Sequence, residues 1–423
     1  MAIPKSLKRG LLTLSFGNLS ARILALLSTP LISRIYDPAS FGQLSLLTSI
    51  TIIAAPLFSL RLPLAIPLPR KDSEAKQIVA ISLALLALLI ILSTAALAIG
   101  FQTKIFEIIH LEKNLLLFLP FALLGYGMQD ILSNWATRKT RYNLIFTAQL
   151  FQSISSTIVK IVYGIALNSS ASIGLFYGYI CGFASYAAVI MLAERKDFNR
   201  PNQIKKKRFC FILNKYLDFI KFLTPSHLLV SLSTQLPIIL VYSQFGKDTA
   251  GYLGMAVMLI NLPVQILARS AGTVLFSEVS KFTRENKTDP FPIIAKISLV
   301  LISTSSCVAI TLFLFSPEIF SFLLGEKWQR AGEFSSLLAI YFPLQMTQAA
   351  ISQLFTVYRA NKTQMLLNVV RIFSVISTFG YSKVANLGEF ETILLLSTVS
   401  FFVYASNILA FFSIARKKAP SMK

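Results

Sequence analysis

Long apolar runs without a charged residue make up most of this chain, and they restrict the folds that it can adopt. Each run approaches or exceeds the length of about 20 residues that a helix needs to cross the hydrocarbon core of a bilayer. Three further segments, residues 10–33, 114–137 and 363–382, qualify if one interior charge each is tolerated. The uncharged runs are residues 41–60, 77–103, 142–159, 161–193, 222–246, 249–268, 297–317, 334–358 and 392–415.

Together these segments predict an all-α integral membrane protein with about twelve transmembrane helices. The composition agrees, because 55% of the 423 residues are hydrophobic and 14% are charged, whereas about a quarter of the residues in a soluble protein are charged. The runs are continuous, which excludes a transmembrane β-barrel, since the strands of a barrel alternate in polarity. No segment is left for a soluble domain.

The formal net charge of +22 suggests a nucleic-acid-binding protein, so the location of the basic residues matters. Most of them lie in alternate loops between the predicted helices, and the densest group falls in residues 195–221. Cytoplasmic loops of membrane proteins carry such an excess of Lys and Arg. The pattern therefore predicts that both termini are cytoplasmic, that the bilayer is the surrounding medium and that nucleic acid is not a partner.

The longest polar stretch divides the chain into two halves of six predicted helices each. We expect an N-terminal lobe in residues 1–193, a cytoplasmic linker in 194–222 and a C-terminal lobe in 223–423. In the linker, apolar side chains at helical spacing follow the basic residues 205–208, which predicts a basic amphipathic helix on the inner leaflet. The apolar set comprises Phe209, Ile212, Leu213, Tyr216 and Ile220.

A weak internal repeat supports the division into halves. The segment 36–44, before the second predicted helix, corresponds to the segment 245–253 before the eighth, so that Gly42 falls on Gly251. Because each half has an even number of helices, both copies enter the membrane in the same direction. The two six-helix lobes are therefore predicted to form a parallel pseudo-repeat with the substrate path between them.

Several chemistries have no support in the sequence. The nearest approach to a phosphate-binding P-loop, residues 246–249, lacks the earlier glycine, because position 241 is Val241. The two histidines, His110 and His227, have no further ligand at metal spacing, and the three cysteines are isolated. We interpret His227 as a packed or interfacial residue. The sequence predicts a transporter without an ATPase motif, rather than an enzyme, and neither a cofactor nor a metal site.

Charged residues inside the predicted helices are the most informative feature of the chain. Each costs roughly 2.5–3.5 kcal/mol near the centre of a bilayer on insertion-based scales. Asp130 is the one clear acid among them, so protein carboxylates cannot neutralise all the basic residues. The remainder need water or an anionic ligand. The basic residues are Arg22, Arg61, Lys160, Arg269 and Arg371.

Four arginines are predicted to bind an anionic group of the substrate, such as a pyrophosphate: Arg22, Arg34, Arg61 and Arg269. A guanidinium binds phosphate through two parallel hydrogen bonds, which suits a cationic wall in a hydrated cavity. Arg22 and Arg269 lie about 20 Å from the basic ends of their helices, too deep to snorkel comfortably. For each arginine the alternative is a structural role through contacts with backbone carbonyls.

Arg371 and Asp130 are further candidates for the anionic cavity, and each has a structural alternative. Arg371 lies near enough to a helix end to snorkel in part. Asp130 could titrate during transport or pair with a neighbouring basic residue. We interpret Lys160 as a lysine that snorkels to the outer interface. Prolines 56, 63, 67 and 263 are predicted to bend the helices beside the cavity.

Two segments near the N-terminus carry a resemblance to a known family. The segment from Ser33 to Gly42, followed by the segment from Ala65 to Asp72, resembles the opening of bacterial Wzx-type polysaccharide flippases. These proteins belong to the multidrug/oligosaccharidyl-lipid/polysaccharide exporter superfamily. The resemblance implies a two-lobed flippase that moves undecaprenyl-pyrophosphate-linked oligosaccharides, such as O-antigen or capsule repeat units, across the bacterial inner membrane by alternating access.

The resemblance also implies a site and partners. Related lipid II flippases have cationic residues on helices one, two and eight that engage the pyrophosphate, and the corresponding predicted helices here carry Arg22, Arg34, Arg61 and Arg269. A polysaccharide polymerase and the chain-length machinery are the implied protein partners. Two other functions stay open. One is a multidrug exporter of the same superfamily, and the other is a membrane polysaccharide polymerase or ligase, for which the outer segments 101–113 and 317–332 are short.

Overall fold

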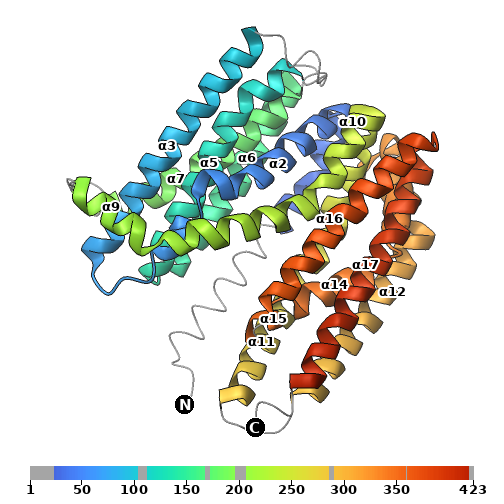
Figure 1. The fold of residues 1–423 in the computed structure, drawn as a ribbon. Helices are drawn as coiled ribbons and strands as arrows, with labels where there is room; N and C mark the ends of the chain where they lie inside the picture. Colours follow the sequence, from blue (N-terminus) through green and yellow to red (C-terminus); the bar gives the residue numbers. More distant parts are fainter. Residues whose placement is uncertain are drawn as a thin grey trace. The chain divides into compact units, whose positions relative to one another are not determined.

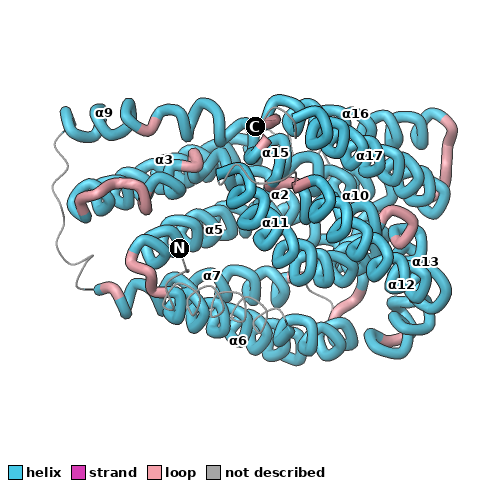
Figure 2. The backbone as a smooth tube through the Cα atoms, turned by 90° about the horizontal axis from the view of Figure 1, so that it is seen from below, coloured by secondary structure: helices cyan, strands magenta, loops and turns pink. Residues whose placement is uncertain are grey.

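The structure, a computed structural model, confirms the predicted all-helical membrane class. It describes residues 23–102, 112–166, 172–195, 206–284, 290–358 and 360–418, and within these ranges it contains helices and connecting turns but no strand (Figures 1 and 2). Nine helices of the described part are long and apolar enough to cross a membrane. Their spans are Pro38–Ser59, Asp72–Gly100, Leu115–Arg138, Tyr142–Ala166, Ile173–Ala193, Phe219–Pro263, Phe291–Leu324, Asn361–Val384 and Glu389–Arg416.

The difference between these nine spans and the expected twelve has identifiable sources. The first expected helix is described only over Ile23–Ile35. The span Phe219–Pro263 covers two expected helices. The expected helix 334–358 is divided among three short helices. Twelve crossings therefore remain a prediction.

The chain divides into two compact units, Met1–Ser231 and Leu232–Lys423. The boundary lies inside a helix, nine residues beyond the linker that the sequence suggested, and the predicted domain limits remain predictions. In the first unit, helices α3, α5, α6 and α7 run side by side (Figure 1). Its elements are α2 (Pro38–Ser59), η1 (Leu62–Ala65), α3 (Asp72–Gln102), α5 (Lys113–Arg138), α6 (Tyr142–Ala166), α7 (Ile173–Ala193), α9 (Lys206–Lys215), the π-helix η2 (Phe219–Leu223) and the start of α10 (Thr224–Pro263).

The start of α2 is fixed by local chemistry in the first of the two family-like segments. Asp37 is the N-cap residue, and its Oδ1 accepts a hydrogen bond of 2.8 Å from the backbone N–H of Ser40. Pro38 occupies the first turn, where its missing N–H costs nothing. The preceding Tyr36 is fully buried and donates its hydroxyl proton to the carbonyl oxygen of Lys160 at 2.7 Å. Burial raises the pKa of Tyr36 to about 12, so this hydroxyl remains a donor.

The second family-like segment is held by one arginine at the end of α5. The Arg138 side chain is 9% exposed. Its Nη1 donates to the carbonyl oxygens of Ile66, Pro67 and Pro69 at 3.3, 3.3 and 2.7 Å, and its Nη2 lies 2.8 Å from Asp72 Oδ1. A turn with two prolines has few N–H groups with which to pair its own carbonyls. Arg138 supplies the missing donors and joins the turn to α5.

Replacement of Arg138 by alanine is expected to destabilise the first unit by about 2–4 kcal/mol, because the turn carbonyls lose their charged donor. Thermal unfolding of the purified protein in detergent would measure this as a lower midpoint. Arg138→Lys should recover part of the loss, since a lysine offers a point charge but not the planar fork. Arg70→Ala is the matched control, because exposed Arg70 lies in the same turn and has no hydrogen bond or ion pair within the described ranges. Equal midpoints for Arg138→Ala and Arg70→Ala would contradict this role.

The linker helix α9 lies against protein, and this corrects part of the sequence interpretation. Ile212 and Tyr216, which we expected to face the inner leaflet, are 1% and 7% exposed and join the hydrophobic core of the first unit. Lys215 Nζ donates to Glu74 Oε1 of α3 at 2.5 Å, and the Tyr216 hydroxyl donates to the same oxygen at 3.0 Å. The hydrogen bond to Glu74 raises the pKa of Lys215. The apolar spacing was recognised correctly, but Ile212 and Tyr216 pack on protein, and α9 contacts α3.

The second unit contains the remaining helices, and a glycine divides the first of them. Gly246, with φ 89° and ψ −175°, interrupts α10 at a conformation that favours glycine. An unbroken helix of 40 residues would be about 60 Å long, twice the thickness of the hydrocarbon core. The later elements are the π-helix η3 (Val264–Ala268), α11 (Arg269–Arg284), α12 (Phe291–Leu324), η4 (Glu326–Trp328), α13 (Gln329–Leu338), α14 (Phe342–Ile351), α15 (Leu354–Val357), α16 (Asn361–Val384) and α17 (Glu389–Lys418).

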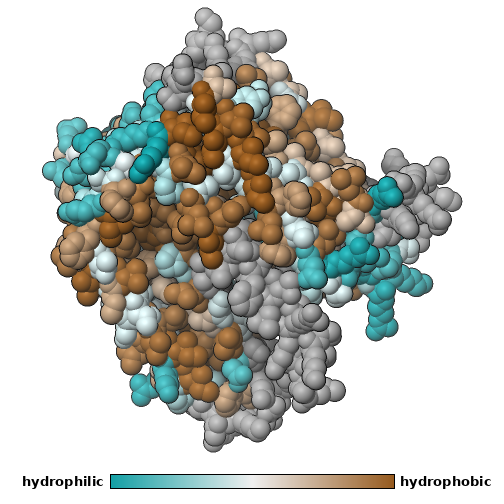
Figure 3. All heavy atoms as spheres, turned by 180° about the vertical axis from the view of Figure 1, so that it is seen from behind, coloured by the Kyte–Doolittle hydropathy of each residue, from teal (hydrophilic) through white to brown (hydrophobic). Residues whose placement is uncertain are grey.

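The core of the second unit lies where α12, α13, α14 and α17 meet. Gly332 of α13 packs directly on the backbone of α12, since a Cβ there would lie 2.5 Å from the carbonyl oxygen of Ser316. Pro343 stands in the first turn of α14, which separates α14 from α13 because a proline cannot continue a preceding helix. On the face drawn in Figure 3, hydrophobic side chains cover much of the described surface, as expected for a protein in lipid.

Candidate functional site

Arg61 stands at a strained break between α2 and η1. Leu60 and Arg61 have φ values of 48° and 49°, in the left-handed region that side chains other than glycine seldom adopt. The backbone N–H of Arg61 donates to Ser59 Oγ at 3.3 Å. Such conformations cost about 1–3 kcal/mol per residue, and they persist where the surrounding structure imposes them. The break turns the Arg61 side chain toward α5 and α10, where the contacts described next are made.

Asp130 of α5 is the counter-ion of Arg61. Asp130 Oδ2 lies 3.7 Å from Arg61 Nη1. The Arg61 side chain is 15% exposed and the Asp130 side chain 14%. The carboxylate is oriented by Asn134, whose Nδ2 donates to Asp130 Oδ1 at 3.2 Å and to the Asp130 carbonyl at 2.8 Å. Of the two roles that the sequence left open for Asp130, pairing with a basic residue is the one observed.

His227, near the start of α10, makes the second contact of Arg61. Its Nδ1 lies 3.1 Å from Arg61 Nη2. An arginine in a protein is always protonated and can only donate, so Nδ1 must be the acceptor and the ring proton sits on Nε2. His227 is therefore a neutral histidine that positions the guanidinium. Its side chain is packed, as expected, but its contact with Arg61 was not predicted from the sequence.

Arg61, Asp130 and His227 form a cluster, here called the Arg61 cluster. Within it, the Arg61 guanidinium keeps hydrogen-bonding capacity. Arg61 Nε and Asp130 Oδ2 are buried and have no hydrogen-bond partner among the described residues. The distance of 3.7 Å between Nη1 and Oδ2 is too long for a direct hydrogen bond. Charged groups out of water are stable only when their hydrogen bonds are satisfied. An anion with several acceptor oxygens would satisfy the unused donors.

The other predicted site residues are less completely described. Arg22 lies outside the described residues. Arg34 is exposed, on the helix Ile23–Ile35. Arg269 is the first residue of α11, directly after the π-helix η3, which itself follows Pro263, and its side chain lies outside the described set. Arg61 and Arg269 thus both follow an interruption of a helix, at nearly corresponding positions of the predicted repeat. Short π-helices are often found at functional sites.

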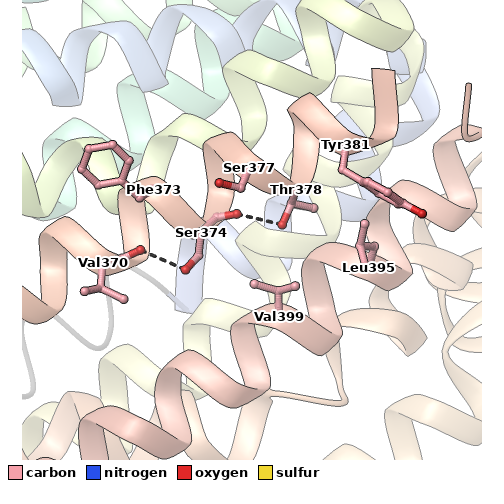
Figure 4. A pocket seen from close by; sticks show the side chains of 8 residues that line it. All are labelled: Val370, Phe373, Ser374, Ser377, Thr378, Tyr381, Leu395 and Val399. Carbon is pink, nitrogen blue, oxygen red and sulfur yellow. Dashed lines mark hydrogen bonds between the residues drawn. The ribbon is translucent and has the colours of Figure 1, made fainter. Parts of the chain in front are cut away.

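Arg371 of α16 lines a separate cavity that is formed entirely by residues of the second unit. Its Cζ lies 4.8 Å from the centroid of the Tyr404 ring. A second hollow of about 510 Å³ lies on another face of α16 and α17 (Figure 4). That hollow is lined by uncharged side chains, and its hydroxyls at Ser374 and Thr378 bond to carbonyls of their own helix. It therefore offers no charged group to a ligand.

His227 is the residue of this site that sequence reasoning missed. Its partner Arg61 is more than 160 positions earlier in the chain, so no local spacing connects them. The available signal was indirect, because a histidine near the start of an apolar helix needs a polar contact for its ring nitrogens. Arg61 and Asp130 were both singled out from the cost of charge in a bilayer, and the structure brings these two together.

A comparison with protein families matches most of the chain. A family model described as "Polysaccharide biosynthesis protein" matches residues 23–333. Comparison with the curated proteins finds no match.

Solved structures share the fold at low sequence identity. A structure described as the lipid II flippase MurJ in an inward closed conformation has a TM-score of 0.73 and 14% identity, and the match covers 97% of this chain and 91% of that one. An inward-facing multidrug resistance MATE family transporter of the MOP superfamily has a TM-score of 0.69 and 14% identity, with 95% of each chain covered. A MOP superfamily transporter from Pyrococcus furiosus has a TM-score of 0.57 and 14% identity, with 98% and 96% covered.

Proposed function

We propose that this chain, which belongs to the polysaccharide biosynthesis protein family, is a flippase that moves undecaprenyl-pyrophosphate-linked oligosaccharides across a bacterial inner membrane. The cargo would be a repeat unit of O-antigen or capsule type, and transport would proceed by alternating access. Both termini would lie in the cytoplasm, as the distribution of basic residues indicates. A polysaccharide polymerase and the chain-length machinery would receive the product.

The observation that carries this proposal is the incompletely satisfied guanidinium of Arg61. It is paired with Asp130 at 3.7 Å and keeps a buried Nε without an acceptor among the described residues. A diphosphate offers several negatively charged acceptor oxygens, and a guanidinium binds such a group through two parallel hydrogen bonds. We propose that Arg61 binds the diphosphate, and that Arg22, Arg34 and Arg269 are further cationic ligands.

Asp130 would then act as a substitute for the substrate. In the absence of cargo it balances the charge of Arg61, and the arriving diphosphate displaces it. When the cargo leaves, Asp130 pairs with the guanidinium again, so that the charge of Arg61 is not left uncompensated in the protein. His227 keeps the guanidinium in position throughout, because its Nδ1 accepts from the Nη2 of Arg61.

Transport would run from the inner to the outer leaflet, and the membrane potential favours this direction. When the inside is negative, the outward movement of a negative group is favoured by about 2.3 kcal/mol per charge per 100 mV. The shared fold supports the same interpretation, since one relative is described as a lipid II flippase. Another is described by a reverse polarity of its binding pocket, which agrees with a family fold that can accommodate cargo of either sign.

A multidrug exporter is the second candidate, because the fold is shared with a multidrug resistance transporter. Exporters of cationic compounds need acidic groups that face their cargo. The cluster described above contains one carboxylate, Asp130, and that carboxylate is paired with Arg61. The charge of the cluster therefore favours an anionic cargo. A polymerase or ligase is the weakest alternative, since no set of catalytic groups is evident in the described residues.

Reconstituted vesicles test the proposed function. The purified protein would be placed in liposomes with a fluorescent polyprenyl-diphosphate disaccharide, and an impermeant quencher would report the fraction of label in the outer leaflet. We expect rapid exchange of the diphosphate-linked sugar and slow exchange of the same disaccharide on a neutral polyprenol. Exchange no faster than in empty vesicles, together with export of a lipophilic cation, would favour the multidrug alternative and contradict the proposal.

A further inference from the structure

A small, partly enclosed cavity lies inside the second unit, and no residue of the Arg61 cluster lines it. Its volume is about 110 Å³, which is enough for several water molecules. Parts of α10, α13, α14, α16 and α17 form its wall. A sugar-bearing lipid diphosphate is much larger than this space. Whatever occupies the cavity is therefore a small species.

The cavity has one charged wall residue, Arg371, and its lining contains no carboxylate. The guanidinium packs on the ring of Tyr404, and Tyr404 stacks on Tyr341 with ring centroids 5.6 Å apart. No carboxylate lies within 4.0 Å of Arg371 in the described ranges. The face of the Tyr404 ring offsets part of the positive charge of Arg371. One aromatic ring is not enough to balance a guanidinium in a membrane helix, which needs a further negative or polar partner.

Polar side chains of the wall add donors to this positive charge. Gln345 Nε2 donates to Asn261 Oδ1 at 3.3 Å, so the Asn261 amide nitrogen keeps its hydrogens for another acceptor. Gln345 Oε1 is buried without a hydrogen-bond partner in the described part of the chain, and it can accept from a water molecule. Ser400 provides a hydroxyl on the same wall. The field of Arg371 repels a metal cation, whereas these donors suit an anion with bound water.

We propose that this cavity binds a small inorganic anion of the halide class, with chloride as the physiological ligand. The anion neutralises Arg371 inside the second unit, and Asn261 and Ser400 complete its coordination together with water. This site is distinct from the proposed diphosphate site, because its lining contains none of the four arginines proposed as diphosphate ligands and its volume excludes the cargo. Its existence does not depend on what the protein transports.

Direct binding and thermal unfolding test the chloride site. Equilibrium binding of radioactive chloride to the purified full chain should saturate at about one ion per chain above the background binding of the detergent. Replacement of gluconate by about 150 mM chloride at constant ionic strength should raise the unfolding midpoint by about 3 °C. Bromide should substitute for chloride, because the two halides carry the same charge and are similar in size.

Variants distinguish this site from general salt effects. Arg371→Gln should abolish both the saturable binding and the chloride-dependent rise in midpoint, and Arg371→Lys should retain binding with at least about tenfold lower affinity. Arg416→Gln is the matched control, because exposed Arg416 lies on α17 of the same unit, and it should behave as the wild type. If Arg371→Gln does not fold, saturable chloride binding to the wild type still decides whether the site exists. Absence of saturable chloride binding to the wild type, or an unchanged chloride response in a folded Arg371→Gln variant, would overturn the proposal.

Discussion

Replacement of Arg61 by alanine is expected to reduce transport of a lipid-linked oligosaccharide by about a hundredfold or more. The reason is the loss of the guanidinium that we propose as the diphosphate ligand, which also leaves Asp130 as an unpaired buried carboxylate. Initial rates of exchange in reconstituted vesicles would measure the loss. The amount of inserted protein, determined on the same vesicles, separates lost transport from lost protein.

Two further variants show whether geometry or charge is needed at this position. Arg61→Lys keeps the charge but cannot form two parallel hydrogen bonds to a phosphate, so an intermediate rate is expected. Arg70→Ala removes an exposed arginine close in the sequence and should leave the rate unchanged. Wild-type exchange by Arg61→Ala would remove Arg61 from the binding site. Equal losses in Arg61→Ala and Arg70→Ala would point to a general effect of positive charge.

Asp130→Asn is expected to change affinity and turnover in opposite directions. The carboxylate competes with the substrate for Arg61, at a distance of 3.7 Å, so its removal should strengthen binding of a polyprenyl diphosphate by about tenfold. Release should slow for the same reason, and exchange at saturating substrate should fall by a similar factor of about ten. Binding and exchange measured on one preparation would give both values.

The isosteric amide in Asp130→Asn limits structural disturbance, because it can still accept the hydrogen bond from Asn134. Asp218→Asn is the matched control, since exposed Asp218 has no ion pair or hydrogen bond in the described residues, and it should alter neither quantity. A purely structural role for Asp130 predicts a loss of both affinity and turnover. That result would contradict the idea that the carboxylate takes the place of the substrate.

The sequence predicted the membrane class and most helix positions because the cost of a polar group in lipid leaves few alternatives. It also indicated Arg61 and Asp130, since a charge within an apolar run is costly wherever the helix packs. Their mutual contact could not be predicted, because it depends on how α2 and α5 pack. The same holds for His227, which meets Arg61 only through the packing of α10 in the first unit.

Local backbone features were predicted in part. The prolines indicated that helices would be interrupted, and the structure has a break at Leu60 and Arg61 and a π-helix after Pro263. The left-handed conformation of two residues with side chains has no sequence signal, because it is imposed by tertiary contacts. The apolar face of α9 was recognised, but periodicity cannot distinguish a face that meets lipid from one that meets α3.

The central claim is that an anionic headgroup balances the Arg61 cluster, and its most direct test is binding of three lipids that share one polyprenyl chain. The purified protein would be titrated with the polyprenyl diphosphate, the monophosphate and the neutral polyprenol. We predict the tightest binding for the diphosphate and the weakest for the alcohol, with a difference between them of at least about a hundredfold that largely disappears in Arg61→Ala. Equal affinity for all three lipids, or the same preference in Arg61→Ala, would contradict the account.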